Sequence, residues 1–248
     1  MSIFGKLMDI LVPPVCAVCG KPGTHGEELC DVCREKFVRE CFEHCPICSK
    51  TAARCVCGDD FSSITRRTFG GRSSFSLTFY KSERKFGESD RVTEKMIFAL
   101  KERGAFADLF AREICRGLLP IFSEDGEDIT KWIITYPPRS TENFMKYGVD
   151  QSEETADRMA KILGCRAKRT MLRGGRSAEQ KNLTSEKRRE NAESTLIPIR
   201  RNITDGGKYI LLDDIITTGS TVRAAAEILY SCGAAAVFPV SIARDMRK

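Results

Sequence analysis

Two neighbouring acids, Asp213 and Asp214, follow an apolar run and precede a turn rich in hydroxyl groups. The run Tyr209–Leu212 is typical of a buried parallel strand, and we expect the two acids to end it. The turn consists of Thr217, Thr218, Gly219, Ser220 and Thr221. We expect a helix from Val222 to Cys232 after the turn. Its N-terminus, the hydroxyls and the backbone N–H groups would hold an anion.

Acids at the carboxyl end of a strand lie where open α/β sheets bind ligands. A 5-phosphoribosyl group would fit, with its hydroxyls on the acids and its phosphate in the turn. The stretch Tyr209–Thr221 resembles the 13-residue signature of type I phosphoribosyltransferases at every position. The alternative is a strand, turn and helix without a ligand. In that case two neighbouring carboxylates would be buried at the end of a strand without a ligand, and burying unpaired charges costs free energy.

A second loop is expected at the end of the strand Lys131–Tyr136, which Pro137 and Pro138 stop. Arg139 can bind a phosphate with two hydrogen bonds, and Ser140 adds a hydroxyl. By itself this pattern favours an ordinary exposed arginine after a strand. Together with the signature, it favours a loop that binds pyrophosphate.

The segment 173–191 is polar and basic and begins with two glycines after Arg173. Its composition is typical of a mobile loop that closes over a phosphorylated ligand and excludes water, and we call this segment the hood. A solvated charged loop is the competing interpretation. The wider segment 166–201 carries eleven basic residues against four acids, a net charge of +7, which favours phosphates on a small ligand or a nucleic acid.

Nine of the twelve cysteines lie between residues 16 and 57. A first pair of C-x2-C turns, ten residues apart, predicts one tetrahedral zinc site. Its ligands are Cys16, Cys19, Cys30 and Cys33. A second zinc site is expected from Cys45, Cys48, Cys55 and Cys57. Its last pair is C-x-C, so Cys41, His25 or His44 could replace one ligand. All-cysteine sites leave no open position, which indicates a structural role.

The 248 residues have a net charge of +6, with 30% charged and 42% hydrophobic residues, which is typical of a soluble globular protein. No apolar run is long enough to span a membrane. The start lacks the basic and apolar regions of a signal peptide, and residues 1–12 predict a short amphipathic helix. Without a secretory signal, clustered cysteines favour metal binding over disulfides, and the cytoplasm as the compartment.

Residues 1–60 are expected to form the N-terminal helix and a double zinc-ribbon module, and residues 61–248 a phosphoribosyltransferase-like domain. In the second region, strands alternate with helices, which predicts an α/β fold with a parallel sheet and helices on both faces. The other expected strands are 74–80, 166–172 and 234–243. The other expected helices are 91–101, 105–119, 150–163 and the start of 184–191.

The order of these parts resembles the ComF/ComFC family, competence-associated phosphoribosyltransferase-like proteins with an N-terminal zinc ribbon. Besides the cysteine turns, the matching pieces are Ile97–Gly104, Tyr147–Gln151, Gln180–Leu183, Arg188–Asn191, Leu211–Gly219 and Ser231–Ala234. The family often has Val-Pro-Leu and Arg-Gly-Phe-Asn-Gln near the pyrophosphate loop. Here Tyr136–Ser140 and Lys146–Gln151 differ, which puts the pyrophosphate contacts in doubt.

The resemblance implies a protein that binds 5-phosphoribosyl-1-pyrophosphate (PRPP) with Mg²⁺ and serves DNA uptake in transformation, with single-stranded DNA and a ComFA-like helicase as partners. In this interpretation Asp213 and Asp214 are the catalytic residues, and Arg139, Ser140 and the turn 217–221 complete PRPP binding. No acceptor site is recognisable, so transfer chemistry stays open. The alternatives are an accessory factor that binds single-stranded DNA and a sensor that binds PRPP without chemistry.

Overall fold

The computed structural model describes residues 15–22, 28–57, 61–81, 90–139, 141–148, 150–174 and 196–245. The expected helix at residues 1–12, most of the hood and the helix start at 184–191 lie outside this part of the chain. In the described part, no helix has the length and apolar character that crossing a membrane requires.

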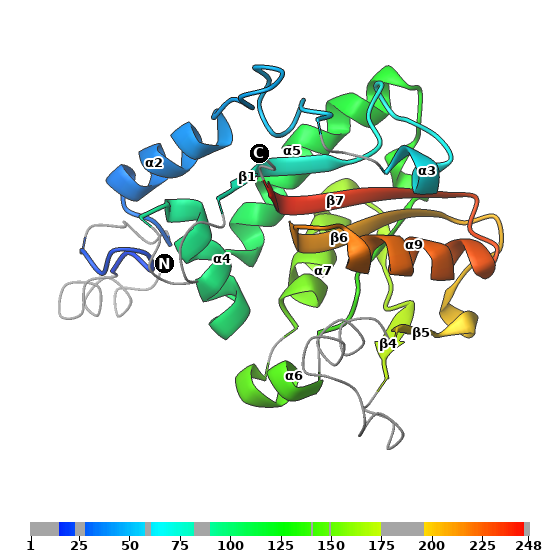
Figure 1. Cartoon of the computed structure of the whole chain (residues 1–248). Helices are drawn as coiled ribbons and strands as arrows, with labels where there is room; N and C mark the ends of the chain where they lie inside the picture. Colours follow the sequence, from blue (N-terminus) through cyan, green and yellow to red (C-terminus); the bar gives the residue numbers. More distant parts are fainter. Residues whose placement is uncertain are drawn as a thin grey trace, which may run out of the picture.

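A five-stranded parallel sheet forms the centre of the molecule, with strand order β1-β7-β6-β2-β3 (Figure 1). The strands are β1 (Phe75–Tyr80), β2 (Ile133–Thr135), β3 (Arg166–Ala167), β6 (Lys208–Ile216) and β7 (Ala236–Asp245). A separate antiparallel pair joins β4 (Met171–Arg173) to β5 (Leu196–Pro198). The parallel sheet confirms the predicted fold class.

Both faces of the sheet are covered, which explains the apolar runs in its strands. On β6, Ile210 and Leu212 pack into the larger core cluster, while Tyr209 and Leu211 pack into the second one. The larger cluster holds residues of α4, α5 and α7, and the second cluster holds those of α9. Figure 1 accordingly shows α9 on one face of the sheet and α5 and α7 on the other.

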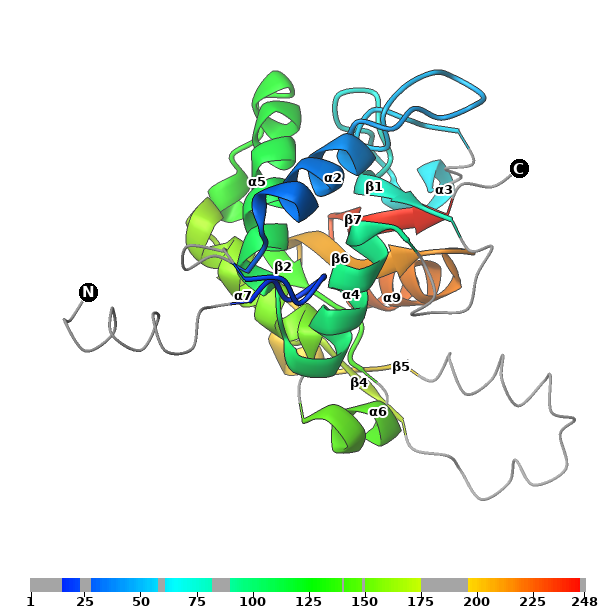
Figure 2. The same ribbon diagram turned by 90° about the vertical axis from the view of Figure 1, so that its left-hand side faces the viewer.

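Helices connect and flank these strands (Figure 2). Their bounds are α2 (Asp31–Cys41), α3 (Ser62–Thr65), α4 (Val92–Arg103), α5 (Ala107–Glu124), α6 (Thr141–Tyr147), α7 (Gln151–Leu163) and α9 (Ser220–Ser231), with short 3-10 helices at Ile129–Lys131 and Arg200–Asn202. The expected helix 150–163 is confirmed. Asp150 caps its start by accepting hydrogen bonds from the N–H groups of Ser152 and Glu153, and Gly164 ends it with a φ of 67°.

Some expected boundaries are wrong. β6 does not end at the two acids but runs on to Ile216, because β7 offers a continuous partner up to the pair Ile216 and Arg244. The expected strand 166–172 is two strands in different sheets: β3 pairs with β2, and β4 pairs with β5. Between them, Thr170 donates or accepts a 2.6 Å hydrogen bond with Thr135. The helices α2, α3 and α6 and the strand β5 were not predicted from the sequence.

The cysteine-rich region packs directly against the sheet domain. Phe37 of α2 meets Phe110 of α5 edge to face, with ring centroids 6.1 Å apart. Glu40 of α2 accepts hydrogen bonds from the N–H groups of Val92 and Thr93, which begin α4, at 2.7 and 2.8 Å. The larger core therefore continues across residue 60, and the proposed boundary there divides the sequence rather than the packed core.

Candidate functional site

The topology places a ligand crevice between β2 and β6. From β2 the chain goes to β3 on one side, and later returns to β6 on the other side. Such a reversal is a topological switch point, and ligands of open α/β sheets bind outside the carboxyl ends of the strands there. A cavity of about 290 Å³ lies at this place. It is lined by residues that follow both strands, among them Arg139, Asp213 and Asp214.

The two acids differ in their surroundings. Oδ2 of Asp214 forms an ion pair with Lys101 Nζ at 3.0 Å. The same oxygen accepts a hydrogen bond from Gln151 Nε2 at 3.2 Å. Asp213 accepts a hydrogen bond from the backbone N–H of Asp214 at 2.9 Å. Burial and the neighbouring Asp214 charge raise the pKa of Asp213 to about 7. One acid is therefore paired with a cation, while the other titrates near neutral pH, as functional carboxyls often do.

Arg139 is held in place by its neighbours. Its Nη1 donates to the backbone carbonyl of Lys101 at 2.6 Å, and its guanidinium lies 4.5 Å from the ring centroid of Tyr147. Its backbone N–H donates to Asp150 Oδ2 at 3.1 Å, so the cap of α7 also fixes the loop after β2. A cation oriented in this way needs little reordering to meet an anion. Ser140 lies outside the described residues.

The turn between β6 and α9 has an arrangement suited to an anion. Gly219 has a φ of 73° and caps α9, which begins at Ser220, two residues before its expected start. Thr217, Thr218 and Ser220 are exposed, and Thr218 Oγ1 contacts Ser220 Oγ at 3.1 Å. Thr221 lines the cavity itself. The N–H groups of the first helical turn have no partners within the helix and can bind an anion.

The structure thus brings four predicted residues, Arg139, Asp213, Asp214 and Thr221, to one cavity. Among the other lining residues, Lys101 and Gln151 were not predicted as site residues, and Arg173 begins the segment predicted as a hood. Lys101 and Gln151 lie in segments that match the family, and that match was the available signal. Only the fold shows that both side chains reach Asp214.

The two cysteine groups have the geometry of metal sites. In each group all four Sγ atoms lie within 4.8 Å of one another. The groups are Cys16, Cys19, Cys30 and Cys33, and Cys45, Cys48, Cys55 and Cys57. The Cys19–Cys30 and Cys48–Cys55 sulfur distances are 3.7 and 3.6 Å. A tetrahedral zinc with Zn–S bonds of about 2.3 Å requires about 3.8 Å between sulfurs. Both groups can therefore hold zinc.

The second group uses the ligands predicted from the irregular C-x-C pair. Cys41 and His44 are not part of it. His25 lies outside the described residues. Burial and nearby carboxylates raise the pKa of Cys41 to about 12. Among the described residues, the N–H groups of Ile47 and Cys57 point to sulfurs of the second group, which is typical of cysteine turns that hold zinc.

Comparison with known proteins agrees with this architecture. A family model described as a phosphoribosyl transferase domain matches residues 150–247. Over 237 residues the chain is 25% identical to the DNA utilization protein YhgH of Salmonella typhimurium, covering 92% of this chain and 96% of that protein. YhgH of Salmonella typhi matches over the same extent. These matches agree with the resemblance to the ComF/ComFC family.

Solved structures similar to this chain include an allosteric regulatory enzyme of purine biosynthesis, with 18% identity and a TM-score of 0.36. Another is glutamine PRPP amidotransferase from B. subtilis complexed with ADP and GMP, with 16% identity and a TM-score of 0.35. The chain spans only 28% of the length of each of these chains. The sheet order and the matched phosphoribosyl transferase domain indicate the fold.

Proposed function

We propose that this ComF-like protein binds PRPP with Mg²⁺ in the cavity between β2 and β6. The observation that carries the proposal is the meeting of Asp213, Asp214 and Arg139 at the topological switch point, beside the start of α9. The two carboxylates would accept hydrogen bonds from the ribose hydroxyls. The turn 217–221 would hold the 5-phosphate, and Arg139 would meet the pyrophosphate, together with Ser140.

The residues present fit a magnesium ion. Mg²⁺ prefers oxygen donors, and the cavity offers the carboxylates of Asp213 and Asp214. The buried Gln151 adds its Oε1 atom, which has no hydrogen-bond partner among the described residues. Bound with the ligand, the ion would neutralise charge on the pyrophosphate.

In a transfer reaction, the bond between the ribose and the pyrophosphate would break while positive charge develops on the sugar. Arg139 would stabilise the negative charge of the leaving pyrophosphate, and it is already oriented by Lys101 and Tyr147. The two acids would fix the ribose through its hydroxyls. The acceptor is not identified, and a sensor that binds PRPP without chemistry would use the same residues.

The similarity to the DNA utilization protein YhgH supports a ComF-like role in DNA uptake. In this proposal the phosphoribosyl site serves that process, with single-stranded DNA and a helicase as partners. Residues 175–195 of the basic segment lie outside the described residues, so the proposal for DNA rests on sequence similarity and charge.

The test is a calorimetric titration of the zinc-loaded protein with PRPP and Mg²⁺. We expect saturable binding that weakens at least about 100-fold in Asp213→Asn/Asp214→Asn, because the variant loses charge-assisted hydrogen bonds to the ribose. A matched control, Asp157→Asn/Glu227→Gln, removes two exposed acids of α7 and α9 and should bind normally. Equal affinity in both variants would contradict the proposed site. Turnover of PRPP with any acceptor would exclude the pure sensor.

A further inference from the structure

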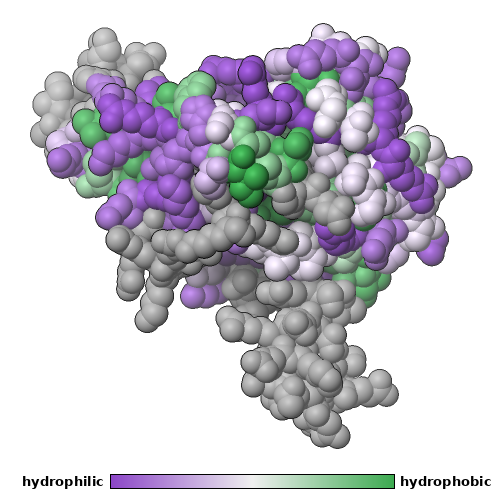
Figure 3. Space-filling view, turned by 45° about the horizontal axis from the view of Figure 1, so that its top comes forward, coloured by the Kyte–Doolittle hydropathy of each residue, from purple (hydrophilic) through white to green (hydrophobic). Residues whose placement is uncertain are grey.

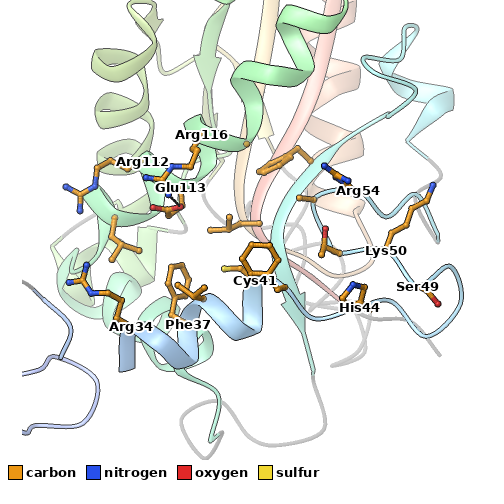
Figure 4. Close-up of a pocket in the computed structure, with 18 residues that line it drawn as sticks. Arg34, Phe37, Cys41, His44, Ser49, Lys50, Arg54, Arg112, Glu113 and Arg116 are labelled. Carbon is orange, nitrogen blue, oxygen red and sulfur yellow. Dashed lines mark hydrogen bonds and ion pairs between the residues drawn. The ribbon is translucent and has the colours of Figure 1, made fainter. Parts of the chain in front are cut away.

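A second, larger cavity lies far from the phosphoribosyl site in the fold, between α2, α5, β1 and the turn of the second cysteine group (Figure 4). Its volume is about 1010 Å³, at the upper end of about 300–1,000 Å³ for ligand pockets. None of its lining residues lines the cavity between β2 and β6. We call it the α2–α5 groove. Its size suits several side chains of a partner better than one small metabolite.

The floor of the groove is apolar. Phe37 of α2 and Phe75 and Leu77 of β1 line it, and all three are buried in the larger core. At its mouth, Val38 and Phe42 remain 46% and 66% exposed. In Figure 3, green hydrophobic patches interrupt the hydrophilic surface on the upper face of the molecule. Exposed apolar side chains beside an apolar floor are typical of an interaction site.

The rim is cationic on opposite sides. Arg34 lies on α2, Arg112 and Arg116 lie on α5, and Lys50 and Arg54 come from the second cysteine turn. Figure 4 shows these side chains around Phe37 and Cys41. The one acid among the lining residues is Glu113, which accepts a hydrogen bond from Arg116 at 3.1 Å. The groove therefore combines an apolar centre with positively charged margins.

We propose that the α2–α5 groove binds an acidic amphipathic helix of a partner protein. Such a helix would place apolar side chains at positions i, i+3, i+4 and i+7 against the exposed Val38 and Phe42, above the buried floor. Carboxylates on both sides of the helix would lie near the arginines. The charge pattern of the groove is complementary to this arrangement on both margins. Electrostatic attraction would speed association and favour acidic over basic helices.

A single-stranded nucleic acid fits the groove less well. Base stacking needs exposed ring faces. Phe37 and Phe75 are only 4% and 2% exposed, which leaves Phe42 as the ring available for stacking among the phenylalanines of the groove. A nucleic acid strand also carries its charge on one backbone, whereas cations lie on both margins here. These observations favour a peptide.

The experiment is a selection of peptides from a phage-displayed library of 16-residue helices, with the zinc-loaded full chain as target. We expect the enriched peptides to be acidic and amphipathic. Labelled copies should bind at least about tenfold more weakly to Arg112→Glu/Arg116→Glu, which reverses the charge of one margin, and to Phe42→Ala, which removes an exposed apolar contact. Both arginines are on the exposed side of α5, so the variants should fold, which a thermal melt and PRPP binding check.

The matched control is Arg200→Glu/Arg201→Glu, which changes the net charge equally at exposed residues outside the groove. It should bind the selected peptides like the wild type. No enrichment, basic peptides, or equal binding by the groove variants would overturn the proposal. Displacement of the peptides by labelled dT20 would overturn it in favour of a nucleic acid. If peptides bound only after deletion of residues 1–12, the chain's own N-terminal segment would be the occupant. If they bound only after dissociation of a dimer, the occupant would be a second copy of the chain. PRPP titration of the same variants is independent of all these outcomes.

Discussion

The cysteine groups and the candidate site between β2 and β6 differ in how widely their residues are spread along the chain. Each cysteine group takes all its ligands from fewer than about twenty consecutive residues, as short zinc motifs do. The cavity between β2 and β6 joins Lys101, Arg139, Gln151 and Asp213, which come from separate helices and loops. A local site depends on the metal for its shape, whereas a site built from distant segments depends on the whole sheet.

This comparison predicts the largest effect for loss of the first metal group. Cys16, Cys30 and Cys33 belong to the larger core, so Cys30→Ser should lower the free energy of unfolding by more than about 4 kcal/mol. Cys57→Ser should cost about 2 kcal/mol, because the second group packs in a small separate cluster. Zinc content and denaturant unfolding measure both. Cys232→Ser, outside either group, is the control, and a larger loss for Cys57→Ser would reverse the comparison.

The turn before α9 should be nearly as sensitive. A Cβ on Gly219 would lie 2.7 Å from the Phe61 ring, and its φ of +73° is strained for other residues. Gly219→Ala should therefore cost about 2 to 4 kcal/mol and weaken PRPP binding.

Gly126→Ala is the matched control for Gly219→Ala. Its φ is +66°, but a Cβ there meets nothing within 4 Å, so it should cost only about 1 to 2 kcal/mol. Thermal melts and PRPP titration distinguish the two variants. Equal costs would mean that the packing against Phe61 has no role in holding the turn.

Arg244 tests whether the sheet supports the second cysteine group. It is buried at the end of β7 and donates to the backbone carbonyl of Cys55 at 2.9 Å and to that of Cys57. Arg244→Met should speed the release of zinc from the second group to a chelator by about tenfold, because it removes groups that orient the ligands. The first group should release zinc at the wild-type rate. Faster release from both groups would indicate general loosening instead.

The smallest effect concerns Asp213. Its pKa is raised from 3.8 to about 7, so between these values the folded protein holds a proton that the unfolded chain releases. Stability in Mg²⁺-free buffer should therefore fall as pH rises through this window. Asp213→Asn should remove the fall and be more stable than the wild type by about 1 kcal/mol at pH 8. PRPP affinity of the wild type should rise over the same window. Opposite slopes would place the titrating group elsewhere.

The sequence predicted the local site better than the distant one. Cysteine spacing alone identified both groups, including the irregular C-x-C ligand Cys57, because short turns determine where their own sulfurs lie. The acids and Thr221 were predicted from the 13-residue signature, and Arg139 from the loop after the expected strand 131–136. Lys101 and Gln151 were missed as site residues, because helices bring them to Asp214 only in the folded sheet. The extent of β6 was wrong for the same reason: its end depends on β7.

The order of the strands bears on how the protein is made. The edge strand β1 pairs within the sheet only with β7, and Arg244 of β7 reaches back 189 residues to Cys55. Phe75 pairs with Val240, 165 residues later, so at about 5–20 residues per second a ribosome needs roughly eight to thirty-three seconds to reach the partner strand. During this time Phe75–Tyr80 has no strand partner, and contacts between such distant residues also form slowly. The newly made chain therefore passes through a period in which an apolar strand edge is open to aggregation or to a chaperone.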